Sequence, residues 1–327
     1  MEALSKIFQH LSKIHMLVVG DVMLDHYISG DVFRISPEAP VPVISVEEER
    51  YVLGAAANVA HNLASLGVQT KLLGTWGKDF HGTCVEQLLQ QVRITAADGS
   101  SMSGVQTILK TRIVARQQQL CRLDREDLPS RYQKAFAHAA AVESLERALA
   151  YVDAIIISDY AKGVVDQGIV DHLAHYAQEH HKILAWDPKP SHELNFSYLT
   201  LMTPNRQEAF ALANMPEDHR HFPKELICKK IFQRYHPQYL VITLGKDGML
   251  LSCDGNIVCQ MPTCAREVFD VSGAGDTVVA MLAAALAAQV APEDAMHLAN
   301  MAAGIVVTKQ GTAVVTAKEI MERAFEV

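Results

Sequence analysis

Short apolar runs alternate with amphipathic helical patterns along most of this chain. The apolar runs predict strands at residues 16–19, 71–75, 154–158, 183–186, 199–202 and 240–244. The segments between them have helical spacing and predict helices at residues 58–66, 82–90, 133–150, 166–179, 205–213 and 224–234. Alternation of this kind is typical of βαβ units. We therefore expect an α/β fold with a central, mostly parallel sheet and helices on both faces.

Two segments depart from the alternation, because residues 27–49 and 105–123 carry strand-like residues with no helix between them. The first predicts two strands around a proline-rich turn, and the second predicts a hairpin. We expect these strands to form a small antiparallel sheet that projects from a single domain spanning residues 1–327. Such a sheet could act as a lid that excludes water from a reactive phosphate. A purely structural edge sheet is the alternative.

Composition limits the classes of partner. The chain has 327 residues and a net charge of -8, with no run of more than two basic residues, which argues against nucleic acid. Its apolar runs are shorter than the roughly 18 residues of a membrane span, and residues 1–15 lack the apolar core of a signal peptide. The six cysteines form no C-x-x-C pair. Reduced thiols and a cytoplasmic protein without a membrane partner are the expectation.

The clearest chemical signal is a small-residue turn that leads into the apolar segment 278–288. Gly273, Ala274 and Gly275 allow several N–H groups to point at one place at a helix N-terminus, where an anion is favoured. Asp276 follows in the same first turn, and its carboxylate would repel that anion. It makes sense as a base that deprotonates a nucleophile attacking a phosphoryl group. Ordinary capping of a helix by an aspartate is the alternative.

Known phosphate loops do not account for the turn. No G-x-x-x-x-G-K-[ST] motif is present, and Val278 stands where a dinucleotide fingerprint needs a small residue. Asp21 and Asp25 follow the first strand, and ligands gather at the carboxyl ends of parallel strands, so either could bind sugar hydroxyls. Gly54 would let a ligand approach the backbone, and Asn58 adds a donor and an acceptor. Turn and cap roles are the alternatives.

Asn205 and Glu208 open a helix and lie three residues apart on one side of it. They could order the water shell of Mg²⁺. A capping box explains the same spacing equally well.

Taken together and in this order, these motifs resemble the PfkB/ribokinase family of small-molecule kinases over residues 16–312. The resemblance implies a ribokinase-like fold with a β-sheet lid, and Asp276 as catalytic base beside an anion hole at residues 273–275. It also implies ATP and Mg²⁺ as cofactors, and K⁺ at the loops around Asp270 and residues 309–312. Nucleotide-binding residues implied by it are Asn205, Glu208, Thr243, Gly245, Gly248, Lys189 and Asn300.

Five further runs resemble the heptose-7-phosphate kinase subgroup of that family. They are residues 30–43, 110–112, 118–124, 158–163 and 187–189. The resemblance implies phosphorylation of O1 of D-glycero-β-D-manno-heptose 7-phosphate, a step toward ADP-heptose for lipopolysaccharide. Many relatives continue into a nucleotidyltransferase domain, whereas this chain has no H-x-G-H-like motif, so it resembles the kinase part alone. One departure is Ala55, where the subgroup has a second glycine.

The substrate's own phosphate needs cations, and the basic side chains in or near the lid and sugar segments are the candidates. They are Arg34, Lys110, Arg112, Arg116, Arg122 and Lys162, and we expect Arg34, Arg112 and Lys162 to contact the substrate, with Arg112 foremost. A solvated charged edge is the alternative for each. The projecting sheet and the resemblance suggest a homodimer. A kinase of another sugar, sugar phosphate or nucleoside is the alternative within the family. A non-catalytic binding protein on the same fold is the alternative outside it.

Overall fold

The predicted apolar runs form one nine-stranded sheet in the computed structural model, which describes residues 2–116, 118–136 and 139–325. The seven strands from β13 to β6 run parallel, in the order β13-β12-β11-β10-β1-β4-β6, and β14 and β15 extend the sheet with antiparallel pairs. The strands are β1 (His15–Gly20), β4 (Gln69–Leu73), β6 (Thr95–Ala96), β10 (Ala154–Ser158), β11 (Ile183–Asp187), β12 (Leu201–Met202), β13 (Tyr239–Thr243), β14 (Met249–Cys253) and β15 (Asn256–Met261).

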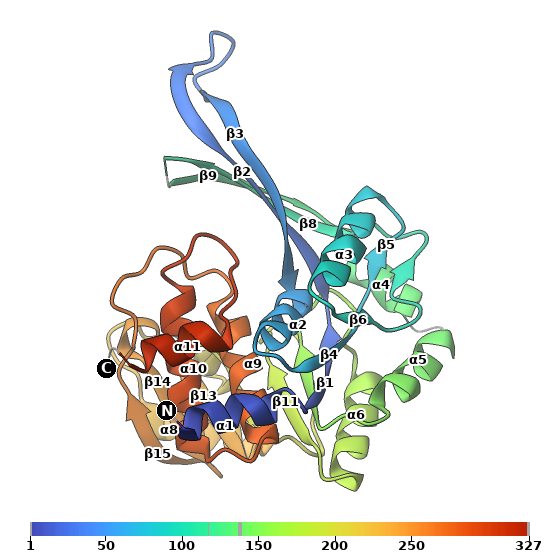
Figure 1. The fold of residues 1–327 in the computed structure, drawn as a ribbon, viewed down its shortest axis with the longest axis vertical. Coiled ribbons are helices and arrows are strands. Elements are labelled where there is room, and N and C mark those ends of the chain that lie inside the picture. Colours follow the sequence, from blue (N-terminus) through green and yellow to red (C-terminus); the bar gives the residue numbers. More distant parts are fainter. Residues whose placement is uncertain (1, 117, 137–138, 326–327) are drawn as a thin grey trace.

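Helices cover both faces of this sheet, as predicted (Figure 1). Side chains alternate along each strand, so Leu17 and Val19 of β1 join one apolar core while Met16 and Val18 join the other. The face of Met16 packs against α1 (Glu2–Leu11), α2 (Ala56–Ser65), α3 (Phe80–Gln91), α9 (Ala274–Ala287), α10 (Pro292–Val306) and α11 (Ala317–Arg323). The other face packs against α5 (Ala139–Leu149), α6 (Gln167–Glu179), α7 (Arg206–Leu212) and α8 (Lys224–Tyr235).

A separate four-stranded sheet, which we call the lid sheet, projects from the body of the molecule (Figure 1). Its order is β3-β2-β8-β9, with β2 (Val22–Ile35), β3 (Pro42–Ala55), β8 (Ile108–Ala115) and β9 (Gln118–Arg125). Its two hairpins confirm the predicted strand pairs, although β2 and β3 are much longer than predicted. The sheet is mixed rather than antiparallel, because β2 and β8 pair in parallel.

The helix predicted over residues 133–150 is instead two helices, α4 (Pro129–Phe136) and α5. The small pair β5 (Trp76–Gly77) and β7 (Ser101–Met102) and the 3₁₀ turn η1 (Gly245–Asp247) complete the elements. Within the described part of the chain, no helix has both the length and the apolar character that crossing a membrane requires.

Candidate active site

The predicted anion turn lies at the N-terminus of α9, where the C-terminal edge of the main sheet meets the base of the lid sheet. Gly273 is the N-cap of α9 and has a φ of 78°, a conformation that glycine adopts without strain. A side chain at this position would also come within 2.8 Å of the Asn58 amide nitrogen. Position 273 therefore requires glycine for two reasons, which are the backbone conformation of the turn and its close contact with α2.

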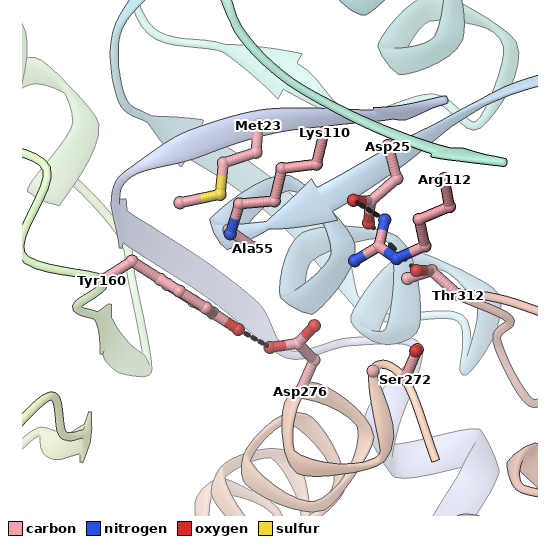
Figure 2. A pocket seen from close by; sticks show the side chains of 10 residues that line it. Met23, Asp25, Ala55, Lys110, Arg112, Tyr160, Ser272, Asp276 and Thr312 are labelled. Carbon is pink, nitrogen blue, oxygen red and sulfur yellow. Dashed lines mark hydrogen bonds and ion pairs between the residues drawn. The ribbon is translucent and has the colours of Figure 1, made fainter. Parts of the chain in front are cut away.

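Asp276 lies in the first turn of α9 and is 4% exposed. Its Oδ2 accepts a 2.6 Å hydrogen bond from the Asn58 amide, and its Oδ1 accepts a 2.9 Å hydrogen bond from the Tyr160 hydroxyl (Figure 2). Burial raises the pKa of Asp276 to about 6, although the two hydrogen bonds lower it in part. At neutral pH the carboxylate is mostly ionised and can accept a proton, which suits a general base.

Tyr160 is the site residue that the sequence reasoning missed. It follows β10, and the only sequence signal was its place inside the family-like run 158–163. Burial and the nearby Asp276 charge raise the pKa of Tyr160 well above its usual value. The hydroxyl therefore stays protonated and donates a hydrogen bond to Asp276. Tyr160 therefore stabilises the ionised form of Asp276.

Asn58 also differs from its predicted role as a sugar contact. It lies in the first turn of α2, and its amide nitrogen is committed to Asp276. Asn62 donates to the Asn58 carbonyl, and the Thr277 hydroxyl donates to Asn62. This buried chain fixes α2 against α9. It holds Asp276 in place rather than leaving Asn58 free for a ligand.

Asp21 is fully buried, and its carboxylate accepts hydrogen bonds from the backbone N–H groups of residues 160, 162 and 164. This geometry argues against the sugar contact that we predicted for Asp21. The three donors belong to the loop that carries Tyr160, so Asp21 fixes that loop. Burial raises its pKa, which the three N–H donors partly offset.

Asp25 does reach the pocket, from β2 at the base of the lid sheet. Its carboxylate pairs with Arg112 of β8 and accepts a 3.0 Å hydrogen bond from the Thr312 hydroxyl. Gly54 of β3 is needed beside it, because a Cβ at that position would lie 2.8 Å from Oδ2 of Asp25. The predicted glycine position therefore serves a close packing contact with the carboxylate.

These groups surround one cavity of about 130 Å³ between the lid sheet and α9 (Figure 2). Asp25 and Arg112 form its lid side, and Asp276 forms its α9 side. The cavity is lined by Met23, Asp25, Ala55, Lys110, Arg112, Tyr160, Ser272, Gly273, Asp276 and Thr312. The predicted Arg34 and Lys162 do not line it. Lys162 pairs instead with Glu126 at 2.7 Å, and Arg34 lies toward the far end of β2.

The residues predicted to bind the nucleotide include Thr243, Gly245 and Gly248, at the end of a neighbouring strand. Thr243 ends β13, and Gly245 and Gly248 form the turn after it with φ of 60° and 85°. A Cβ at Gly248 would lie 1.9 Å from the Met261 carbonyl oxygen, so the turn packs tightly. A second cavity of about 470 Å³ opens beside this turn and is lined in part by Arg206, Lys224, Leu244 and Lys246.

Asn300 holds a loop rather than facing a cavity. Its amide donates to the Pro262 carbonyl at 2.7 Å and accepts from the Cys264 N–H at 3.3 Å. Lys189 follows β11 and helps keep the nearby Glu208 ionised. Nucleotide binding by Asn300 and Lys189 stays a prediction.

Asn205 and Glu208 form a complete capping box at the start of α7. Each side chain accepts a hydrogen bond from the other's backbone N–H, at 3.0 Å and 2.8 Å. Burial raises the pKa of Glu208. The box uses one oxygen of each side chain, which leaves the second Glu208 oxygen for a water ligand of Mg²⁺. Among the described residues, no three His, Cys, Asp or Glu side chains are placed to hold a metal directly. Any Mg²⁺ beside Asn205 and Glu208 would be held through its water ligands.

Asp270 joins two loops. One oxygen accepts from the Ser272 N–H at 2.9 Å and the other from the Gly311 N–H at 3.0 Å. Both oxygens are thus committed to the backbone. Any K⁺ here would take carbonyl oxygens of these loops, with Asp270 holding the loops together.

Comparisons with known proteins agree with the resemblance in the sequence and with the observed fold. The model of the pfkB family carbohydrate kinases matches residues 13–319. The chain is 41% identical over 94% of its length to "Bifunctional protein HldE" of Alcanivorax borkumensis, and 37% identical over 93% to the protein of that name from Helicobacter pylori. It spans 63% and 65% of the length of these two curated relatives.

Among solved structures, ribokinase of Arabidopsis thaliana, complexed with ribose and ATP, is similar with a TM-score of 0.72 and 19% identity, over 95% of this chain and 98% of that one. Phosphofructokinase-2 of Escherichia coli has a TM-score of 0.72 and 17% identity, over 95% and 98%. At these identities the likeness establishes the ribokinase-like fold.

Proposed function

The chain belongs to the PfkB family of carbohydrate kinases, and we propose that it transfers the γ-phosphoryl group of ATP to O1 of D-glycero-β-D-manno-heptose 7-phosphate. The product would be the 1,7-bisphosphate, a precursor of ADP-heptose for lipopolysaccharide. The observation that carries the proposal is Asp276, a buried carboxylate that faces the pocket at the N-terminus of α9 and is held by Asn58 and Tyr160.

In the proposed reaction, Asp276 removes the proton from the O1 hydroxyl as O1 attacks the γ-phosphorus. The bond from that phosphorus to its bridging oxygen breaks, and ADP leaves with the electron pair. The N–H groups at residues 273–275 face the charge that develops on the transferred group. Tyr160 and Asn58 keep the carboxylate ionised and aimed, so the base needs no reorganisation during the step.

ATP would lie along the strand ends from the turn at residues 243–248 to the N-terminus of α9. Mg²⁺ bound to its phosphates would neutralise their charge, with Asn205 and Glu208 ordering the ion's waters. Lys189 would face the phosphates. K⁺ would bind carbonyl oxygens of the loops that Asp270 joins, and equal rates in sodium and potassium buffers would remove it from the proposal.

The sugar would lie in the 130 Å³ cavity under the lid sheet, with Asp25 accepting hydrogen bonds from ring hydroxyls. The heptose 7-phosphate assignment rests on the subgroup-like runs, two of which are residues 110–112 and 158–163. Those runs supply Lys110, Arg112 and Tyr160 to this cavity. A reaction that consumes ATP and a sugar phosphate is expected in the cytoplasm.

We also propose a homodimer that buries the outer part of the lid sheet. Phe33, Ile35 and Val46 are all more than half exposed there, and large exposed apolar groups favour a protein partner. Light scattering on the purified protein would give the mass of a dimer. A monomer at micromolar concentration would remove this part of the proposal.

The function is tested by ATP consumption with heptose 7-phosphate, ribose, fructose and adenosine in parallel. We expect the highest kcat/KM for heptose 7-phosphate. Preference for one of the other three would replace the substrate and keep the kinase. No sugar-dependent turnover, with ATP still bound, would favour the non-catalytic binding protein.

A further inference from the structure

Lys110 of β8 lines the cavity, yet its ammonium group lacks a carboxylate partner among the described residues. Its side chain runs toward Tyr160 and Ala55, away from the ion pair of Asp25 and Arg112 (Figure 2). The ammonium lies over the Tyr160 ring, 5.7 Å from its centre. A cation in this setting is held by an aromatic face and by distant charges alone.

The two carboxylates nearest to Lys110 in the sheet are committed elsewhere. Asp25 is its neighbour on β2, and Asp124 is its neighbour on β9. Asp25 pairs with Arg112 and Thr312, as described above. Asp124 is held by Arg122 through two hydrogen bonds, at 2.8 Å and 2.9 Å. The lid sheet therefore places a lysine between two acidic residues and satisfies both with other donors.

The other basic side chains of the lid sheet and the Tyr160 loop either pair with a carboxylate or are absent from the lining of the cavity. Lys162 is bound to Glu126 and Arg116 to Asp31, both outside the cavity. Arg112 lines the cavity but is neutralised by Asp25. Lys110 is thus the cavity cation whose charge is not balanced by a direct partner.

Holding an unpaired ammonium in a part-buried site costs free energy. In agreement, burial lowers the pKa of Lys110, although the negative charges of Asp25 and Asp124 oppose the effect. An anion bound in the cavity would remove that cost. The cost is therefore a reason to expect an anionic group on the natural ligand at this point.

We propose that Lys110 binds the phosphate that the sugar substrate already carries, and that it makes the enzyme select a phosphorylated sugar over the unphosphorylated one. This inference deepens the proposed function and rests on it. It selects Lys110 from the basic residues that the sequence offered for this role, in place of the favoured Arg112. Arg112 then acts on Asp25, orienting the carboxylate that meets ring hydroxyls.

The test compares Lys110→Met with the wild type on two substrates, heptose 7-phosphate and the same heptose without its phosphate. Loss of a charge-assisted hydrogen bond should lower kcat/KM for the phosphorylated sugar about 10- to 100-fold, through KM. The unphosphorylated sugar should lose less than about 2-fold. Lys110→Arg should recover part of the lost selectivity, because it keeps the charge.

Lys229→Met is the matched control, since it makes the same chemical change on the exposed surface of α8. It should leave both substrates unaffected. ATP affinity close to that of the wild type would show that Lys110→Met is folded.

Equal losses on both sugars would overturn the proposal and assign Lys110 to the transferred phosphoryl group. No loss on either would overturn it as well. If the wild type prefers a different sugar phosphate, the heptose assignment fails, and the same comparison with that sugar and its unphosphorylated form still tests Lys110.

Discussion

Two aspartates line the same cavity in opposite chemical settings. Asp276, on α9, is held by the uncharged donors Asn58 and Tyr160. Asp25, at the base of the lid sheet, is held by the guanidinium of Arg112. A direct cationic partner stabilises a carboxylate's charge far more than neutral donors do. Asp25 is therefore suited to accept hydrogen bonds while it is held in its ion pair, whereas Asp276, with a pKa raised to about 6, can gain and lose a proton near neutral pH.

The source of each partner reinforces this contrast. Asn58 and Tyr160 belong to the body of the molecule. The Asn58 carbonyl accepts a buried hydrogen bond from Asn62, and the Tyr160 backbone N–H donates a part-buried one to Asp21. Arg112 belongs to the lid sheet, and the Thr312 hydroxyl bonds Asp25 to the loop between α10 and α11. Asp276, the proposed base, thus belongs to the body of the molecule, while Asp25 lies where the lid sheet meets that body.

Removing the base should have the largest effect. Asp276→Asn keeps the size and the hydrogen-bonding capacity of the side chain but cannot take a proton. We expect kcat to fall by about 10²–10⁴-fold, with ATP affinity largely kept. The measurement is steady-state kinetics with nucleotide binding by calorimetry. A kcat near that of the wild type would show that another group is the base.

Breaking the ion pair between Asp25 and Arg112 should weaken binding of the sugar. Arg112→Ala leaves Asp25 without its cation, and KM for the sugar phosphate should rise about 10- to 100-fold, with a much smaller change for ATP. Arg116→Ala is the control, because it breaks the exposed ion pair with Asp31 farther out on the lid sheet. A sugar KM that stays at the wild-type value in Arg112→Ala would contradict this role.

Glu208 offers a carboxylate that is neither a base nor an ion-pair partner. Glu208→Gln retains an oxygen for the capping box but loses the charge that orders the waters of Mg²⁺. The Mg²⁺ concentration for half activity should rise about 3- to 10-fold. Glu319→Gln makes the same change in the capping box of α11 and should leave the Mg²⁺ titration unchanged. If both variants titrate alike, Glu208 is a helix cap and nothing more.

The smallest expected effect is on stability, at the residue that links the lid sheet to the body of the molecule. Ala55 joins lid strand β3 to α2, and its φ of 52° and ψ of -130° suit glycine. Ala55→Gly should relieve this backbone strain and stabilise the fold by a net of about 1 kcal/mol. The net value allows for the entropy that glycine adds to the unfolded chain, which opposes the gain. Ala56→Gly, one residue on in regular helix, should destabilise it by a similar amount. Urea unfolding would measure the stability of both variants. A lower unfolding midpoint for Ala55→Gly than for the wild type would show that Ala55 is not strained.

The sequence predicted the sheet, the helices on both its faces, the lid strands and the place of Asp276 in the first turn of a helix, because periodicity and turn chemistry are local signals. It did not assign partners. Asp21 and Asn58 look like ligand-binding residues from their positions after a strand and at a helix start. Whether such a side chain meets a ligand or a neighbouring loop depends on contacts 139 or 218 residues away in the chain.

The basic residues show the same limit. Arg34, Lys162, Lys110 and Arg112 are equivalent as sequence, since each is a cation in a family-like run. Only the folded arrangement shows that Lys162 is paired, that Arg34 is remote and that Lys110 lines the cavity without a direct partner. The choice among them is set by cross-strand register, which a single chain's pattern does not determine.

The most direct test of the account is the pH dependence of the single-turnover phosphoryl-transfer rate in the wild type and in Tyr160→Phe. Asp276 must be ionised to accept a proton, so the wild-type rate should rise with pH through about 6 and then level off. Tyr160→Phe removes a donor that stabilises the ionised form, so its midpoint should move to higher pH. A rate that is independent of pH between about 5 and 8, or an unmoved midpoint in Tyr160→Phe, would contradict a base held by neutral donors.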